Sequence, residues 1–135
     1  MAETNLDLVR GGFETVNQKG VEALLPFIHA EFEVTTPAGL AAEPDTYRGP
    51  DGVRRYFDSF YEAMDRVEFA PQRLIAVGEL TVVQLTLRAR GRTTGIETEQ
   101  HISQVWELRD GMAIRVTVFA TLEEAISAAE AAGDR

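Results

Sequence analysis

The chain has 135 residues, enough for one domain with one hydrophobic core, and its 44% hydrophobic and 26% charged residues are typical of a folded, soluble protein. The sequence contains no cysteine, which excludes disulfides, Cys-bound zinc, iron–sulfur clusters and thiol nucleophiles. Its net charge of −9 repels phosphate backbones and anionic lipid headgroups, so neither nucleic acid nor a membrane is an expected partner.

The N-terminal segment predicts two helices and a strand. Residues 4–18 carry apolar side chains at helical spacing, and Gly11 and Gly12 within this helix suggest a bend or the close approach of another element. A short helix is expected over residues 21–30 and a strand over residues 31–37. No apolar run approaches the roughly 18 residues of a membrane span, and the start of the chain lacks a signal-peptide pattern, so we expect a cytoplasmic protein.

The next segments predict a loop and an aromatic helix. Residues 38–52 are rich in turn-forming Gly and Pro and have no hydrophobic period, as in loops that close over pockets. The helix expected over residues 53–64 has one strongly apolar face. Its members are Val53, Tyr56, Phe57, Phe60, Tyr61 and Met64. Such a face can pack into a core or form the wall of a pocket, and the sequence leaves both open.

From residue 68 onward the hydrophobic period changes from that of a helix to that of a strand. Strands are expected over residues 68–77, 80–90, 97–108 and 112–120. The turns between them are too short for crossovers, so these strands are antiparallel. A last helix over residues 121–132 begins at Thr121, whose hydroxyl can cap it, with Glu124 at the third helical position. This order predicts an α+β fold with the helices on one face of a curved sheet.

The last hairpin permits two registers that turn opposite faces inward. A two-residue loop of Asp110 and Gly111 gives two faces of mixed polarity, whereas a three-residue loop that includes Arg109 gives one nearly apolar face, so we expect the longer loop. It pairs Leu108 with Met112, Trp106 with Ile114, Gln104 with Val116 and Ile102 with Val118. These residues then face inward, and the outward residues are His101, Ser103, Val105, Glu107, Ala113, Arg115, Thr117 and Phe119.

Each face of this hairpin suggests an interaction. Gln104 is the one strongly polar side chain on the inner face, and a buried amide must find hydrogen-bond partners, so it contacts either a ligand or another protein group. On the outer face, apolar side chains are mixed with polar ones and no remaining element of the chain is expected to cover them. We therefore predict a homodimer interface formed by His101, Val105, Arg115, Thr117 and Phe119.

The order of elements, together with GVEALL at residues 20–25, TP at 36–37, YRGPDG at 47–52 and RDG at 109–111, resembles the SnoaL-like branch of the nuclear-transport-factor-2-like (ketosteroid-isomerase-like) superfamily. The resemblance extends over essentially the whole chain and implies a single domain spanning residues 1–135. It also implies a cone-shaped fold in which a strongly bent, mostly antiparallel sheet wraps around N-terminal helices, with a C-terminal helix, an apolar pocket inside and a homodimer through the outer sheet face.

The acid/base residues of the steroid isomerases are absent. The resemblance places Phe13, Gln104 and Thr36 where those enzymes have a Tyr and two Asp, and none of the three can shuttle a proton near neutral pH. Polyketide cyclases of the superfamily often have an Asp towards the end of the last strand, but residues 117–121 contain no carboxylate. The catalytic residues are therefore unknown, and an isomerase-, cyclase- or hydratase-like activity is implied by the resemblance alone.

Metals and cofactors are not expected. Neither His29 nor His101 has a second ligand at metal spacing, and the sequence contains no phosphate loop or dinucleotide motif. The expected ligand is a small, mainly apolar molecule in a cavity larger than about 300 Å³. The predicted ligand-binding residues are Phe13, Val34, Thr36, Tyr56, Phe57, Phe60, Gln104, Trp106 and Val116. The alternative is a non-catalytic binding or dimerisation module whose pocket has filled with side chains.

Overall fold

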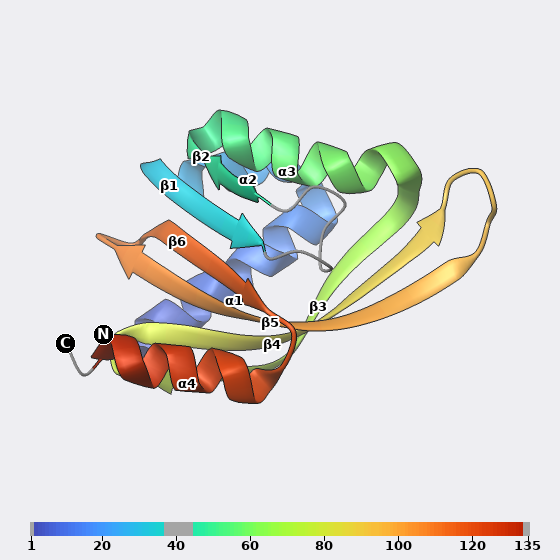
Figure 1. Cartoon of the computed structure of the whole chain (residues 1–135). Helices are drawn as coiled ribbons and strands as arrows, with labels where there is room; N and C mark the ends of the chain where they lie inside the picture. Colours follow the sequence, from blue (N-terminus) through green and yellow to red (C-terminus); the bar gives the residue numbers. More distant parts are fainter. Residues whose placement is uncertain (1, 37–44, 134–135) are drawn as a thin grey trace.

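The computed structural model describes residues 2–36 and 45–133, which form four α-helices around one six-stranded sheet (Figure 1). The elements are α1 (Ala2–Lys19), α2 (Val21–Leu24), η1 (Leu25–Phe27), β1 (Ile28–Thr36), β2 (Asp45–Arg48), α3 (Gly49–Ala63), β3 (Met64–Val77), β4 (Leu80–Gly91), β5 (Glu97–Arg109), β6 (Met112–Phe119) and α4 (Leu122–Gly133). The sheet order is β2-β1-β6-β5-β4-β3, and only β1 and β6 pair in parallel. The predicted α+β fold with a bent, mostly antiparallel sheet is confirmed.

Several element boundaries differ from the sequence prediction. Pro26 ends α2 early, because proline cannot continue the α-helical hydrogen-bond pattern, and a 3₁₀ turn leads directly into β1. Part of the expected 38–52 loop is instead β2 and the first turn of α3; residues 37–44 lie outside the described part of the chain. Gly52 permits the close approach of α3 to β2, since a Cβ there would lie 2.9 Å from the carbonyl carbon of Tyr47.

The helices cover both faces of the sheet, and the prediction that they share one face is wrong. α1 and α3 lie on the concave side, whereas α4 lies along the opposite side (Figure 1). Because successive residues of a strand point to opposite faces, Val82 packs under α4 while Val83 packs towards α1, and both are fully buried. α4 starts as expected: the Glu124 amide donates to the Thr121 hydroxyl at 3.2 Å.

The β5–β6 hairpin also differs from the prediction. Asp110 and Gly111, with φ of 53° and 78°, form a two-residue loop, so the three-residue loop and its four residue pairs are wrong. Left-handed backbone at both loop residues matches the twist of the flanking strands. A bulge at Ile114 then adds one residue to β6, so that Trp106 pairs with Val116. Gln104, beyond the bulge, likewise shifts by two residues and pairs with Val118. Leu108, before the bulge, shifts by one residue and pairs with Ala113, which is buried rather than outward-facing.

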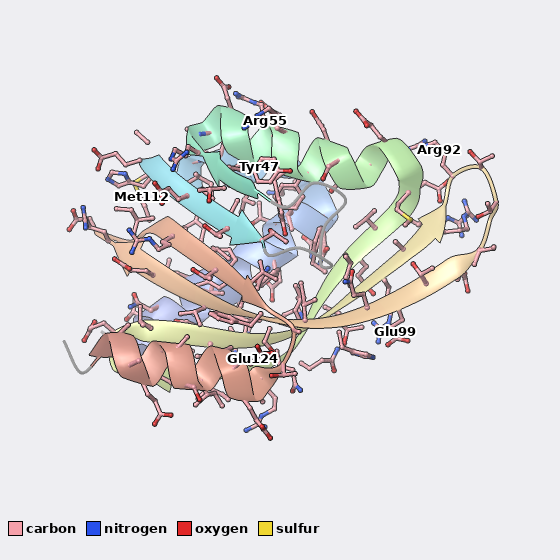
Figure 2. All side chains as sticks on the ribbon, viewed as in Figure 1. Tyr47, Arg55, Arg92, Glu99, Met112 and Glu124 are labelled. Atoms are coloured by element: carbon pink, nitrogen blue, oxygen red, sulfur yellow. The ribbon has the colours of Figure 1, made fainter. Side chains whose placement is uncertain are left out.

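Strands β4 and β5 continue past the end of α3 as a curved, projecting arm, whereas β3 begins where α3 ends (Figure 1). Arg92, near the end of this arm, donates from Nη2 to the carbonyl oxygens of Tyr61 at 2.7 Å and Met64 at 3.2 Å (Figure 2). In the middle of α3, the Arg55 guanidinium lies 5.1 Å from the centre of the Tyr47 ring of β2. α3 is therefore held at its C-terminal end by Arg92 and at its middle by the contact with Tyr47.

Candidate ligand pocket

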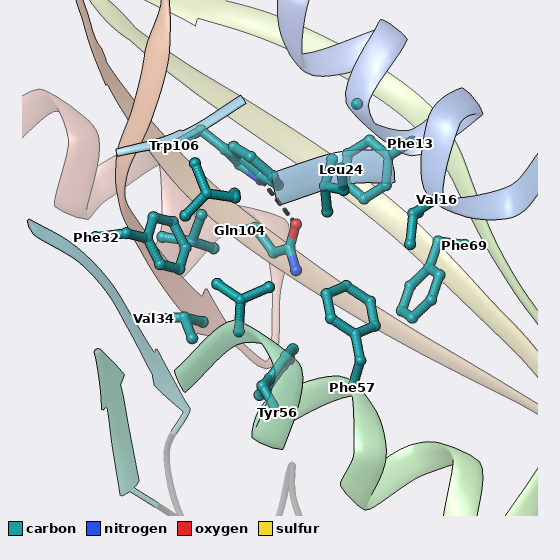
Figure 3. Close-up of a pocket in the computed structure, with 14 residues that line it drawn as sticks. Phe13, Val16, Leu24, Phe32, Val34, Tyr56, Phe57, Phe69, Gln104 and Trp106 are labelled. Carbon is teal, nitrogen blue, oxygen red and sulfur yellow. Dashed lines mark hydrogen bonds between the residues drawn. The ribbon is translucent and has the colours of Figure 1, made fainter. Parts of the chain in front are cut away.

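A pocket lies inside the concave face, between α1, α3 and the inner side of the sheet (Figure 3). The predicted residues that line it are Phe13, Val34, Tyr56, Phe57, Gln104, Trp106 and Val116. Gly12, Val16, Leu24, Ile28, Phe32, Val53 and Phe69 complete the lining. Thr36 is buried on the same inner strand face but does not border the pocket, and the side chain of Phe60 lies outside the described part. That these residues bind a ligand stays a prediction.

Some of the lining residues that were not predicted could have been identified from sequence patterns, whereas others could not. Phe32 alternates with Val34 on β1, and Val16 follows Phe13 by one helical turn, so strand and helix periods could have found both. Phe69 depends on the placement of edge strand β3 against α1, which no local pattern specifies. Gly12 also lines the pocket. A Cβ at this position would lie 3.3 Å from the Phe27 ring, and this close approach explains a glycine within the helix. A Cβ at Gly11 would meet no such neighbour among the described residues.

Aromatic side chains leave little free space in the pocket. Its volume is about 50 Å³, well below the expected 300 Å³, and corresponds to room for a few water molecules. Phe13 packs edge-on against Trp106 with 5.5 Å between ring centres, and Phe57 packs in the same way against Phe69 at 5.3 Å. The expectation of a preformed, ligand-sized cavity is therefore not met.

The one amide of the pocket has a fixed orientation. Trp106 Nε1 donates to Gln104 Oε1 at 2.8 Å, and since an indole N–H can only donate, the amide oxygen must face it. The Gln104 nitrogen is then turned away from Trp106, towards the side of the pocket where Tyr56 and Phe57 lie (Figure 3). Within residues 2–36 and 45–133, no acceptor bonds this nitrogen. The pocket thus presents two hydrogen-bond donors in apolar surroundings.

A second polar group lies next to the pocket. The Thr36 hydroxyl is buried and has no hydrogen-bond partner in the described part of the chain. Burial raises the pKa of the Tyr56 phenol, and the opposing effect of the Thr36 side chain does not cancel this shift. Tyr56 therefore stays neutral near pH 7 and can supply a hydroxyl but no base.

Among the described residues, the pocket lining contains no carboxylate, imidazole or cationic group. His101 lies on the outer sheet face, exposed, with Nδ1 3.1 Å from the Thr86 hydroxyl. His29 Nδ1 accepts a hydrogen bond from the Glu31 amide at 3.0 Å. In the described ranges, no group of three or more His, Cys, Asp or Glu side chains could hold a metal ion. The lining can therefore orient a polar group but cannot transfer a proton by titration near neutral pH.

The predicted dimer interface is partly covered by the chain itself. Val105 and Phe119 pack against α4 in a second hydrophobic cluster, so the premise that nothing covers this face is wrong. His101 and Arg115 are exposed, and Thr117 is partly buried. None of the helices in the part that the structure describes is long and apolar enough to cross a membrane.

Solved structures with this fold include proteins linked by name to small organic molecules. TerC, co-crystallised with polyporic acid, has 20% identity and a TM-score of 0.76, with 92% of this chain and 98% of that one covered. A SnoaL-like protein from Jannaschia sp. CCS1, assigned as a polyketide cyclase, has 16% identity and a TM-score of 0.74, with 97% of this chain and 94% of that one covered. SalBIII, an epoxide hydrolase/cyclase-like enzyme with a role in pyran ring formation in the polyether salinomycin, has 20% identity and a TM-score of 0.74. The match covers 90% of this chain and 93% of SalBIII.

These similarities show the fold, while the family follows from the sequence model. No curated protein matches the sequence. The model of the SnoaL-like domain matches residues 9–116, which include α1, α3 and almost all of the sheet that surrounds the pocket. The chain belongs to the SnoaL-like domain family.

Proposed function

We propose that the protein binds a small, neutral, mainly apolar molecule that carries a hydrogen-bond-accepting oxygen. The observation that supports this proposal is the Gln104 amide nitrogen, which Trp106 holds in the donor orientation inside an otherwise apolar pocket. This nitrogen has no acceptor among the described residues, so a ligand carbonyl or ether oxygen inside the pocket can accept a hydrogen bond from it, worth about 0.5–1.5 kcal/mol.

A neutral ligand fits the lining better than a charged one. Moving an ionised carboxylate into a site without a cation is strongly unfavourable, and two neutral N–H donors do not compensate for it. An ammonium group would find no carboxylate in the lining. The polyketide cyclase, SalBIII and the polyporic acid complex of TerC support the general class of small organic molecules.

The pocket supports polar assistance rather than acid/base catalysis. If the ligand reacts, the Gln104 donors can stabilise negative charge that develops on its oxygen, and the aromatic walls exclude water. Isomerisation, cyclisation or hydration belongs to this class of chemistry. The proton would then move within the substrate or to water, since the lining residues that the structure describes offer no titrating base.

A matched pair of ligands tests the proposal. 1-Tetralone and tetralin are similar in size and shape and differ by one carbonyl oxygen, so calorimetry with both measures what that oxygen contributes. We expect tetralone to bind about 2- to 10-fold more tightly, the equivalent of one hydrogen bond, and Gln104→Leu to abolish the difference. Gln100→Leu is the control, since Gln100 lies on the same strand and inner face outside the lining. Equal affinities in the wild type would contradict the role of Gln104.

The small cavity favours one alternative. With a volume of about 50 Å³ and closely packed rings, the interior can be read as the filled core of a non-catalytic binding or dimerisation module. In that case neither tetralone nor tetralin binds the wild type, and Gln104→Leu changes stability alone.

A homodimer through the outer sheet face remains part of the proposal. The interface would use the part of that face that α4 leaves open, with His101, Arg115 and Thr117. Sedimentation equilibrium at micromolar concentration tests it: we expect a dimer, and Arg115→Glu should weaken it. A monomer would contradict it.

A further inference from the structure

The end of α1 packs against edge strand β3, and one side chain makes hydrogen bonds between them. Asn17 Oδ1 accepts from the Phe69 amide at 2.9 Å, and Asn17 Nδ2 donates to the Phe69 carbonyl at 2.8 Å. A side-chain amide in this position replaces the peptide group of a neighbouring strand, since it offers one acceptor and one donor to the same residue. We call this pair of hydrogen bonds the Asn17 clamp.

The clamp lies directly at the wall of the pocket. Phe69 lines the pocket from β3, and Val16, the residue before Asn17, lines it from α1. The strands that surround the pocket are joined by continuous backbone ladders from β1 through β6, β5 and β4 to β3. The series of backbone ladders ends at β3, which is an edge strand. Towards α1, the two hydrogen bonds of the clamp stand where a neighbouring strand would bond to Phe69.

The backbone on both sides of the clamp can deform. The pairing of β3 with β4 is irregular before Phe69, between Asp65 and Glu68, and again after it, between Pro71 and Arg73. Bulges of this kind interrupt the ladder and weaken its hold on the strand. At the other side, Gly20 follows α1 with a φ of 88°, and a Cβ there would meet nothing within 4 Å. The regular backbone pattern is therefore interrupted next to both partners of the clamp.

From these observations we infer that the Asn17 clamp is the latch of the pocket, and that a ligand enters between α1 and β3 when its two hydrogen bonds open. A pocket of about 50 Å³ must widen before it can hold a molecule of the proposed size, so some part of its wall has to move. Asn17 is then a positioning residue that keeps the pocket closed. The identity of the entering molecule rests on the proposed function, whereas the opening itself does not.

The single tryptophan reports this opening without any ligand. Trp106 lines the pocket and is only 7% exposed, so quenching of its fluorescence by acrylamide measures access to the interior. We expect Asn17→Ala to raise the quenching constant by about twofold or more, because local opening becomes more frequent. Asn5→Ala is the matched control, since Asn5 also lies on α1 and makes one hydrogen bond to the Glu79 carbonyl at 3.3 Å, away from the pocket. Equal quenching in the two variants would overturn the latch.

A second variant separates the latch from a folding defect. Asn17→Asp keeps the acceptor for the Phe69 amide but loses the donor to its carbonyl, so we expect intermediate quenching and faster hydrogen exchange of the Phe69 amide. If both Asn17 variants fail to fold while Asn5→Ala folds, the latch is overturned as well, since a latch must open without loss of the fold.

Binding of 1-tetralone distinguishes this inference from the proposed function. If the closed state limits binding, Asn17→Ala should bind tetralone more tightly than the wild type, in proportion to the added population of the open state. Equal affinities would contradict the latch and leave the pocket function standing. Absence of binding to every variant, together with increased quenching in Asn17→Ala, would contradict the proposed function and leave the latch standing.

Discussion

The two faces of the sheet use the same strands in opposite ways. Under α4, the outer face forms a hydrophobic cluster in which Val82, Ala125 and Ala129 are fully buried, and the buried Thr86 hydroxyl of this face is bonded to His101. The inner face is larger and more aromatic, and it retains an amide at Gln104 and a Thr36 hydroxyl that has no hydrogen-bond partner among the described residues. Because a buried polar group without a partner reduces stability, this difference within the described part of the chain suggests that the inner face serves more than packing.

Truncation on each face tests whether both are true cores. Leu85 on the inner face and Val82 on the outer face are buried at neighbouring positions of β4. We expect Leu85→Ala to lower the free energy of unfolding by about 2–5 kcal/mol and Val82→Ala by about 1.5–3 kcal/mol, measured by urea denaturation. A loss below about 0.5 kcal/mol for Val82→Ala would mean that α4 packs only loosely on the sheet, and the outer face would then not count as a second core.

The unpartnered hydroxyl gives the sharpest contrast between the faces. Thr36→Val should raise the free energy of unfolding by about 1 kcal/mol, since the methyl group replaces a buried hydroxyl without a partner. Thr86→Val, the matched change on the outer face, should lower it by about 1 kcal/mol, because the Thr86 hydroxyl is bonded to His101. A loss of stability in Thr36→Val would show that the hydroxyl is satisfied and would remove the contrast.

The smallest expected effect concerns the charged part of the outer face. Hydrogen bonds from Arg90, at 2.9 and 3.2 Å, lower the pKa of Asp65 below its usual range. A lowered folded-state pKa adds stability above about pH 4, and this stability is lost as the pH falls through the folded-state value. Asp65→Asn should therefore show a slightly weaker loss of stability below about pH 4 than the wild type, by thermal denaturation. Identical pH profiles would show that the pair contributes nothing.

The sequence predicted the fold class and much of the pocket wall, because these depend on hydrophobic periods. The alternation in β5 correctly placed Gln104 and Trp106 on the inner face, and the aromatic period of α3 placed Tyr56 and Phe57 there. The prediction of the hairpin loop was wrong, since a bulge leaves no mark in a two-residue alternation. α4 on the outer face was missed because an amphipathic helix does not encode which side of a sheet it covers.

Free volume could not be predicted for a related reason. The identities of the lining residues determine that the pocket is apolar and aromatic. The volume left between the side chains of Phe13, Phe57, Phe69 and Trp106 depends instead on how their rings pack. Asn17 gave no sequence signal either, since its partner Phe69 is 52 residues away in the chain. Both properties arise from tertiary contacts between segments that local patterns cannot relate.

The bulge at Ile114 has a consequence for how this wall can change during evolution. Ile114 is the residue of β6 that pairs with no residue of β5, so its loss would leave Trp106 opposite Val116 and every later pair unchanged. If Ile114 stayed in the strand and the bulge were straightened, the same two-residue turn would place Arg115 opposite Trp106 and bring a charge to the inner face. Loss of one residue at the bulge is therefore compatible with the present pairing, whereas straightening the bulge at constant chain length exchanges the two faces of the strand.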